Sequence, residues 1–214
     1  MSGRSPREAL ELADYRARVA ELYIECAGEG AEATAEFRRR RDRLFAEHPA
    51  SALTPEQRER FDGLPYFPHD PDARVRCELQ EPREPGELAI DSGGEDGVVR
   101  YSRVGRLETQ RGELTLFWTE GYGGNLFLPF RDATAPEETY GAGRYLTDAV
   151  KGTFRGGLEA ELPGEGPATV TLDFNYAYNP SCAYNSRWAC PLAPPENRLD
   201  QPIRAGELRF GDAV

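Results

Sequence analysis

The first third of the chain repeats apolar residues at the three- and four-residue spacing that is typical of amphipathic helices. This pattern predicts one helix over residues 6–27 and a second from about Ala31 to Glu47. Thr54-Pro55-Glu56-Gln57 then has the residue types of a capping box at the start of a short third helix. Arg38 to Arg41 form a basic run on the second helix, and opposite an apolar stripe we expect such a run to be a solvated face.

Beyond these helices the period of the pattern changes to two. Arg74 to Gln80 alternates polar and apolar residues, as a half-buried strand does. Similar runs cover residues 97–104, 113–119, 125–130 and 168–175, and the glycine-containing pairs Gly93-Gly94, Asp96-Gly97, Arg111-Gly112 and Gly123-Gly124 suit hairpin turns. Short strands without long helices between them favour an antiparallel β barrel or sandwich. The predicted class is therefore α+β, with an N-terminal helical segment (1–62) and an antiparallel β domain (63–214) in one compact unit.

Residues 175–202 follow neither period and are rich in proline, asparagine and aromatic side chains. Long irregular stretches inside compact domains are usually either disordered or functional. The aromatic content of this stretch is too high for stable disorder, because those side chains need burial. We expect a long, ordered C-terminal loop that packs on the β domain.

Composition excludes several classes of partner. An apolar content of 39% and a charged content of 29% are typical of a globular protein, and no run approaches the 18 apolar residues of a membrane span. The net charge of −11 disfavours nucleic acid and anionic membranes. Without an apolar leader the expected location is the cytoplasm. Lys151 is the only lysine among 26 basic residues, which we interpret as genome composition or acidic adaptation to salt, without chemical meaning.

Several motifs resemble the domain-of-unknown-function family 1684. The C-terminal ones are Leu126-Phe127-Leu128-Pro129-Phe130-Arg131-Asp132-Ala133-Thr134, Thr139-Tyr140-Gly141-Ala142-Gly143-Arg144-Tyr145-Leu146, Asp173-Phe174-Asn175, Tyr178-Asn179-Pro180-Ser181-Cys182-Ala183-Tyr184, Cys190-Pro191-Leu192 and Pro195-Glu196-Asn197-Arg198-Leu199. Upstream, His48-Pro49 and Gly63-Leu64-Pro65-Tyr66-Phe67-Pro68 are similar to the same family. The resemblance spans residues 37–206. It implies kinship and brings no assigned reaction.

Within these motifs, Arg131 and Arg144 have the planar guanidinium that binds carboxylate or phosphate with two hydrogen bonds. The alternative is structural pairing of either arginine with Asp132, Glu138 or Asp173. The glycines of Tyr140-Gly141-Ala142-Gly143 allow close backbone approach, but they lack the third glycine and the strand–helix context of a dinucleotide loop.

Of the four cysteines, Cys182 and Cys190 stand too far apart for a zinc pair, whose members are separated by about two to four residues. Buried thiols, a disulfide, a reactive thiol or a metal site assisted by other side chains remain open. Cys182 is the stronger candidate nucleophile because Pro191 stiffens the chain after Cys190. Asp173 and Glu196 are a weaker candidate acid–base pair.

Three functions compete on this evidence. The favoured prediction is a protein that binds a small anionic or polar molecule at the mouth of a β barrel, without a cofactor or metal. The alternatives are a hydrolase that uses Cys182 or the Asp173/Glu196 pair, and a structural or interaction module without a ligand. The residues predicted to line the binding site are Arg131, Asp132, Thr134, Tyr140, Gly141, Gly143, Arg144, Asp173, Asn175, Asn179, Cys182, Tyr184, Glu196 and Asn197.

Overall fold

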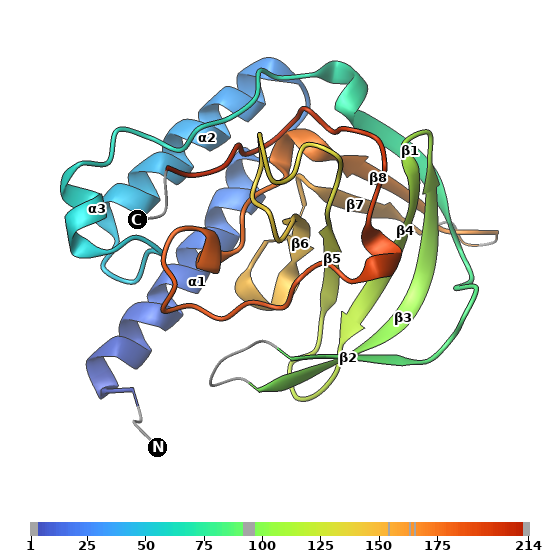
Figure 1. The fold of residues 1–214 in the computed structure, drawn as a ribbon, viewed down its shortest axis with the longest axis horizontal. Helices are drawn as coiled ribbons and strands as arrows, with labels where there is room; N and C mark the ends of the chain where they lie inside the picture. Colours follow the sequence, from blue (N-terminus) through green and yellow to red (C-terminus); the bar gives the residue numbers. More distant parts are fainter. Residues whose placement is uncertain (1–3, 92–96, 154, 163, 165, 212–214) are drawn as a thin grey trace.

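A computed structural model describes residues 4–91, 97–153, 155–162, 164 and 166–211. Two long helices, α1 (Pro6–Cys26) and α2 (Gly30–Glu47), pack against one another beside the sheet, and α3 (Pro55–Glu59) follows (Figure 1). The capping box predicted for α3 is present, since the Thr54 amide donates to Gln57 Oε1 (2.7 Å) and the Gln57 amide to Thr54 Oγ1 (3.1 Å). Among the described residues, no helix combines the length and apolar character that crossing a membrane requires.

Within the described residues, eight strands form a nearly closed antiparallel β barrel, so the barrel alternative is confirmed over the sandwich. The strands follow the order β6-β5-β4-β3-β1-β8-β7, with β2 paired to β3. Their bounds are β1 (Arg74–Gln80), β2 (Glu87–Asp91), β3 (Val98–Thr109), β4 (Gly112–Thr119), β5 (Leu126–Phe130), β6 (Arg144–Asp148), β7 (Leu158–Glu161) and β8 (Thr169–Asp173). The two outer strands approach one another at Gly157, where a Cβ atom would lie 2.1 Å from the carbonyl oxygen of Leu146.

The strands expected from alternation are present, with shifted ends, and three others were not predicted. Strand β6 is buried along its whole length and therefore shows no polar–apolar alternation. Strands β2 and β7 are short. Of the expected hairpins, those at Arg111-Gly112 and Gly123-Gly124 join β3 to β4 and β4 to β5. The Gly93-Gly94 turn and Asp96 lie outside the described residues.

The main core fills the barrel with leucine, valine and phenylalanine side chains, including Leu107, Leu128 and Phe130 at 0% exposure. A second cluster joins α1 and α2 to the barrel through Phe37, whose ring meets Tyr176 edge-on at 4.9 Å. The helical segment therefore covers part of the barrel with aromatic contacts, which position α1 beside the C-terminal loop.

The C-terminal loop packs against the barrel and the helices, as expected. It contains the short 3-10 helices η3 (Phe174–Tyr176), η4 (Ser181–Ala183) and η5 (Pro195–Asn197). Tyr178 forms an antiparallel bridge with Tyr145 of β6, and the Tyr184 side chain is 4% exposed. In Figure 1 the orange part of this loop runs past α1, so a loop distant in sequence borders the first helix.

One expectation about the helices is wrong. Arg41, placed by sequence on a solvated face, is 7% exposed and pairs with the buried carboxylate of Glu207. Its guanidinium also donates to Tyr66 Oη (3.1 Å). The partner carboxylate comes from the other end of the chain, so the local pattern on α2 did not indicate the pair.

Candidate functional site

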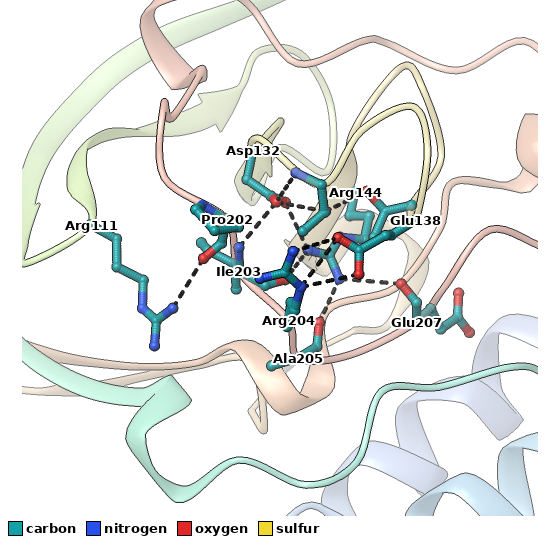
Figure 2. Close-up of polar contacts among 11 residues, drawn as sticks. Arg111, Asp132, Glu138, Arg144, Pro202, Ile203, Arg204, Ala205 and Glu207 are labelled. Atoms are coloured by element: carbon teal, nitrogen blue, oxygen red, sulfur yellow. Dashed lines mark hydrogen bonds and ion pairs between the residues drawn. The ribbon is translucent and has the colours of Figure 1, made fainter.

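Arg144, at the start of β6, is enclosed by the protein and is 1% exposed. One terminal nitrogen donates to Asp132 Oδ2 (2.8 Å) and to the carbonyl oxygen of Ile203 (2.9 Å), and the other donates to the carbonyl oxygens of Ala205 and Glu207 (Figure 2). Burial lowers the pKa of Arg144, and Asp132 opposes that shift. The structural pairing considered for Arg144 is the arrangement found.

Asp132 completes this buried cluster. Its Oδ1 accepts from the Thr134 amide (2.9 Å), the Thr134 hydroxyl (2.6 Å) and the Ile203 amide (3.1 Å). Burial alone would raise the pKa of Asp132, but Arg144 and the Thr134 hydrogen bonds outweigh burial and hold the pKa below its usual range. Both residues thus fasten β6 and the turn after β5 to residues 203–207.

Arg131 and the glycine turn, residues 140–143, also contact other parts of the same chain. Arg131 Nε donates to the carbonyl oxygen of Gly141 (2.8 Å), which closes the loop between β5 and β6. Gly143 has a φ of +98°, and a Cβ there would lie 2.5 Å from the carbonyl oxygen of Phe130. The glycine is required by backbone geometry, and the close approach predicted for this turn is to the chain itself.

The other predicted residues fall into separate places. Asp173 accepts from the Asn175 amide and side chain (both 2.9 Å), and burial raises the pKa of Asp173. Glu196 pairs with Arg103 (2.8 Å), and Asn197 bridges β4 and β5 through Thr115 and the Pro129 carbonyl oxygen. Each carboxylate of the proposed acid–base pair therefore has its own partners.

A cleft of about 690 Å³ opens where α1, the 3-10 helix η2 (Ala149–Lys151) and the loop around η4 meet. It contains two of the predicted residues, Tyr140 and Cys182, together with Cys190 and the indole of Trp188. The remaining lining residues are Arg4, Leu12, Tyr15, Arg16, Ala50, Ala52, Asp91, Lys151, Ser181, Ser186, Arg187, Ala189 and Leu192. A hollow of this size matches the volumes of small-molecule sites.

The charges on the cleft wall are mostly positive. Arg4, Arg16, Lys151 and Arg187 face one lining carboxylate, Asp91, among the residues that the structure describes. Lys151 lies 3.2 Å from Asp148, whose charge outweighs the effect of burial and raises the pKa of the lysine. None of Arg4, Arg16 and Arg187 forms an ion pair with a described residue, and the Arg187 guanidinium lies over the Trp188 ring at 4.7 Å. The donor groups of these three arginines therefore have no carboxylate partner among the described residues.

The cleft continues inward to a cavity of about 60 Å³ beneath α1 and α2, and Tyr15, Lys151 and Ser181 line both spaces. Asn179 and Tyr184, two of the predicted site residues, line the inner cavity rather than the cleft. Burial raises the pKa of Tyr15 to about 12, so its hydroxyl stays protonated at neutral pH.

Two thiols form one wall of the cleft. All four cysteines are free, and the Cys182 amide donates to Cys190 Sγ (3.4 Å). The hydroxyl of Tyr140 donates to Cys182 Sγ (3.7 Å). Within the described part of the chain, no group of three or more histidine, cysteine, aspartate or glutamate side chains is arranged to hold a metal ion.

A family model described as "Protein of unknown function (DUF1684)" matches residues 59–208. The chain belongs to this family. A solved structure of an uncharacterised protein from Haloarcula marismortui, determined by NMR in solution, is 34% identical, with a TM-score of 0.53. The match covers 81% of this chain and 91% of that one. No curated protein matches the chain.

The DUF1684 match begins after α1 and α2, so it includes the thiol pair, Lys151 and the Arg144 cluster but not Arg16. The sequence missed Lys151 and Arg16 as site residues. The sequence marks Lys151 only as the single lysine, a feature that genome composition also explains. No local signal marked Arg16, because it belongs to the cleft only through the packing of α1 against the loop.

Proposed function

We propose that the protein binds a small anionic molecule in the cleft between α1, η2 and the loop around η4. The observation that supports this most directly is the concentration of positive side chains on the cleft wall of a chain whose net charge is −11. A ligand with carboxylate or phosphate groups gains charge-assisted hydrogen bonds from arginine there.

The proposed ligand is still a small anion, as predicted from the sequence, but the proposed site is the cleft and not the surroundings of Arg131 and Arg144. The guanidinium of Arg144 is occupied by Asp132 and backbone carbonyl oxygens, and Arg131 holds its own loop. Arg16 and Arg187 supply the same chemistry at the cleft, where Tyr140 adds an aromatic wall.

The free cysteines support a cytoplasmic location, because a reducing compartment keeps thiols unpaired. The negative net charge supports small anions rather than nucleic acid as the partner, since nucleic acid requires an extended basic face.

The test uses Trp188 as an internal reporter. The chain has two tryptophans, so Trp118→Phe leaves Trp188, on the cleft wall, as the only indole. Succinate and pyrophosphate are titrated into this variant while its fluorescence is recorded, with neutral succinamide alongside. We expect a saturable change with at least one anion and none with succinamide.

Arg16→Ala and Arg18→Ala form a matched pair on one helix. Arg16 lines the cleft, whereas Arg18 lies outside it and pairs with Asp14 (2.8 Å). A hydrogen bond to a charged group contributes about 1.5–3 kcal/mol, so Arg16→Ala should weaken the affinity roughly 10-fold or more. Equal affinities in the two variants, or no saturable change with either anion, would refute the proposal.

A further inference from the structure

The cleft wall holds a pair of thiols that the binding proposal leaves without a role. Cys182 belongs to η4, and the chain then turns back so that Cys190 Sγ accepts the Cys182 amide at 3.4 Å. Both residues line the cleft, although Cys190 is only 4% exposed and Cys182 is partly exposed. Residues 183–189 therefore form a loop whose two ends are brought together by the contact between the Cys182 amide and Cys190 Sγ.

The surroundings of the pair favour one thiolate and one thiol. A hydrogen bond from the Cys182 thiol, the Lys151 charge and the Cys182 amide lower the pKa of Cys190, against burial and Asp148. The pKa of Cys182 is raised in turn, chiefly by Cys190 and by burial. Thiol–disulfide exchange begins with attack by a thiolate, and a second thiol beside it can then resolve the mixed disulfide.

The other two cysteines lack this environment. Cys26 packs in the cluster between the helices and the barrel, and Cys77 lies on β1, where burial raises its pKa. Neither lines the cleft. The chemistry is therefore confined to Cys182 and Cys190, and Cys77 supplies a control on the same molecule.

We propose that Cys182 and Cys190 form a redox-active dithiol that exchanges with a low-molecular-weight disulfide carrying carboxylate groups, bound in the cleft. This inference rests on the proposed function, because Arg16 and Arg187 would hold the carboxylates while the thiols react.

The exchange proceeds in two displacements. The Cys190 thiolate attacks one sulfur of the bound disulfide, forming a Cys190–substrate mixed disulfide and releasing the other half as a thiolate. The sulfur of Cys182 then attacks Cys190 Sγ, which forms the Cys182–Cys190 disulfide and expels the second half. The proton of Cys182 ends on a released half, so the protein loses two electrons and the substrate gains them.

Lys151 and Tyr140 have defined parts in this sequence. The Lys151 ammonium stabilises the attacking thiolate through its charge. The Tyr140 hydroxyl donates to Cys182 Sγ (3.7 Å) and keeps that sulfur beside Cys190. Once Cys190 is in the mixed disulfide, its negative charge is gone, so its contribution to the raised pKa of Cys182 is removed and only that of burial remains.

The experiment compares three disulfides that differ in charge. The reduced full-length protein is incubated with oxidised glutathione, neutral hydroxyethyl disulfide or cationic cystamine, and intact mass and peptide maps are recorded over time. We expect the protein to lose two hydrogens through a Cys182–Cys190 link, at least 10-fold faster with oxidised glutathione than with cystamine. Cys182→Ser should stop at a Cys190 glutathione adduct, whereas Cys77→Ser should react like the wild type.

The outcomes separate the two proposals. No Cys182–Cys190 link with any disulfide overturns the dithiol inference, even if succinate or pyrophosphate still changes Trp188 fluorescence. Linkage at equal rates with all three disulfides overturns the carboxylate selectivity and, with it, the substrate class. If Cys182→Ser fails to fold, the charge comparison on the wild type remains decisive. If the double variant Arg16→Ala, Arg187→Ala still reacts faster with oxidised glutathione than with cystamine by the same factor, the assigned substrate class is also refuted.

Discussion

Replacing Arg144 with alanine tests the structural role assigned to the buried cluster. The substitution removes the ion pair with Asp132 and leaves that carboxylate, 2% exposed, without its cation. It also removes the donor to carbonyl oxygens of residues 203–207. Breaking a buried pair from one side costs about 3–5 kcal/mol, which for a chain of this size lowers Tm by roughly 6–20 °C.

The assay is urea denaturation followed by circular dichroism, with Arg204→Ala as the matched control. Arg204 pairs with Glu138 (3.0 Å), but their side chains are 62% and 37% exposed. Figure 2 shows this second pair beside the buried one. Exposed pairs contribute about 0–1 kcal/mol. A free energy of unfolding that falls no further in Arg144→Ala than in Arg204→Ala contradicts the assigned role.

The pH dependence of the difference in unfolding free energy between the wild type and Arg144→Ala gives an independent check. In the wild type the folded pKa of Asp132 is below its unfolded value, so its stabilisation is present above the unfolded pKa and is lost as the pH falls through the folded pKa. In Arg144→Ala, burial remains without the cation, so the folded pKa rises and acid stabilises the variant relative to neutral pH. The difference in unfolding free energy between the wild type and Arg144→Ala should therefore shrink as the pH falls. A difference that grows toward low pH would contradict this account.

Two further predictions concern the cleft and the glycine turn. Iodoacetamide should label Cys190 at a rate that is near its maximum at pH 7 and falls only at lower pH, because the pKa of Cys190 is lowered. Labelling of Cys77 should require alkaline pH, because burial raises the pKa of that thiol. Peptide mass spectrometry measures both rates, and identical pH profiles for the two cysteines would contradict the assignment. Gly143→Ala should lower the free energy of unfolding in urea by about 1–3 kcal/mol, because Gly143 has a positive φ and a Cβ there would contact the Phe130 carbonyl oxygen. Gly30→Ala is the control, since Gly30 has a positive φ but no atom near the Cβ position, and it should lose less. A smaller loss at Gly143 than at Gly30 would contradict the close approach.

The helices and most of the long strands could be predicted from residue periodicity, because each buries one face. Strand β6 could not, since both of its faces are covered and its five residues carry no alternation. The same burial explains why Arg144 resembled a ligand-binding residue in sequence. Asp132 is a nearby partner that the sequence offered, but the other acceptors are carbonyl oxygens of residues 203–207, some 60 positions later, and no local pattern indicates them.

The candidate cleft was only partly accessible to sequence reasoning. Tyr140 and Cys182 were identified from their residue types and motifs, but their position beside Lys151 depends on how η2 packs. The sequence favoured Cys182 over Cys190 as the nucleophile from the rigidity of Pro191. The structure favours Cys190 through charge and hydrogen bonding, which depend on groups that the intervening loop brings together.

The hydrogen bonds from Arg144 to the carbonyl oxygens of residues 203–207 have a consequence for biogenesis. During synthesis, β6 leaves the ribosome well before the segment whose carbonyl oxygens accept from the Arg144 guanidinium. Until that segment emerges, the Arg144 guanidinium has Asp132 as a partner but lacks its backbone carbonyl acceptors, so its burial and the closure of the barrel are opposed. Final closure is thus deferred until residues 203–207 have been synthesised, and products that stop short of Ile203 should be removed by cellular proteases instead of accumulating as partly functional protein.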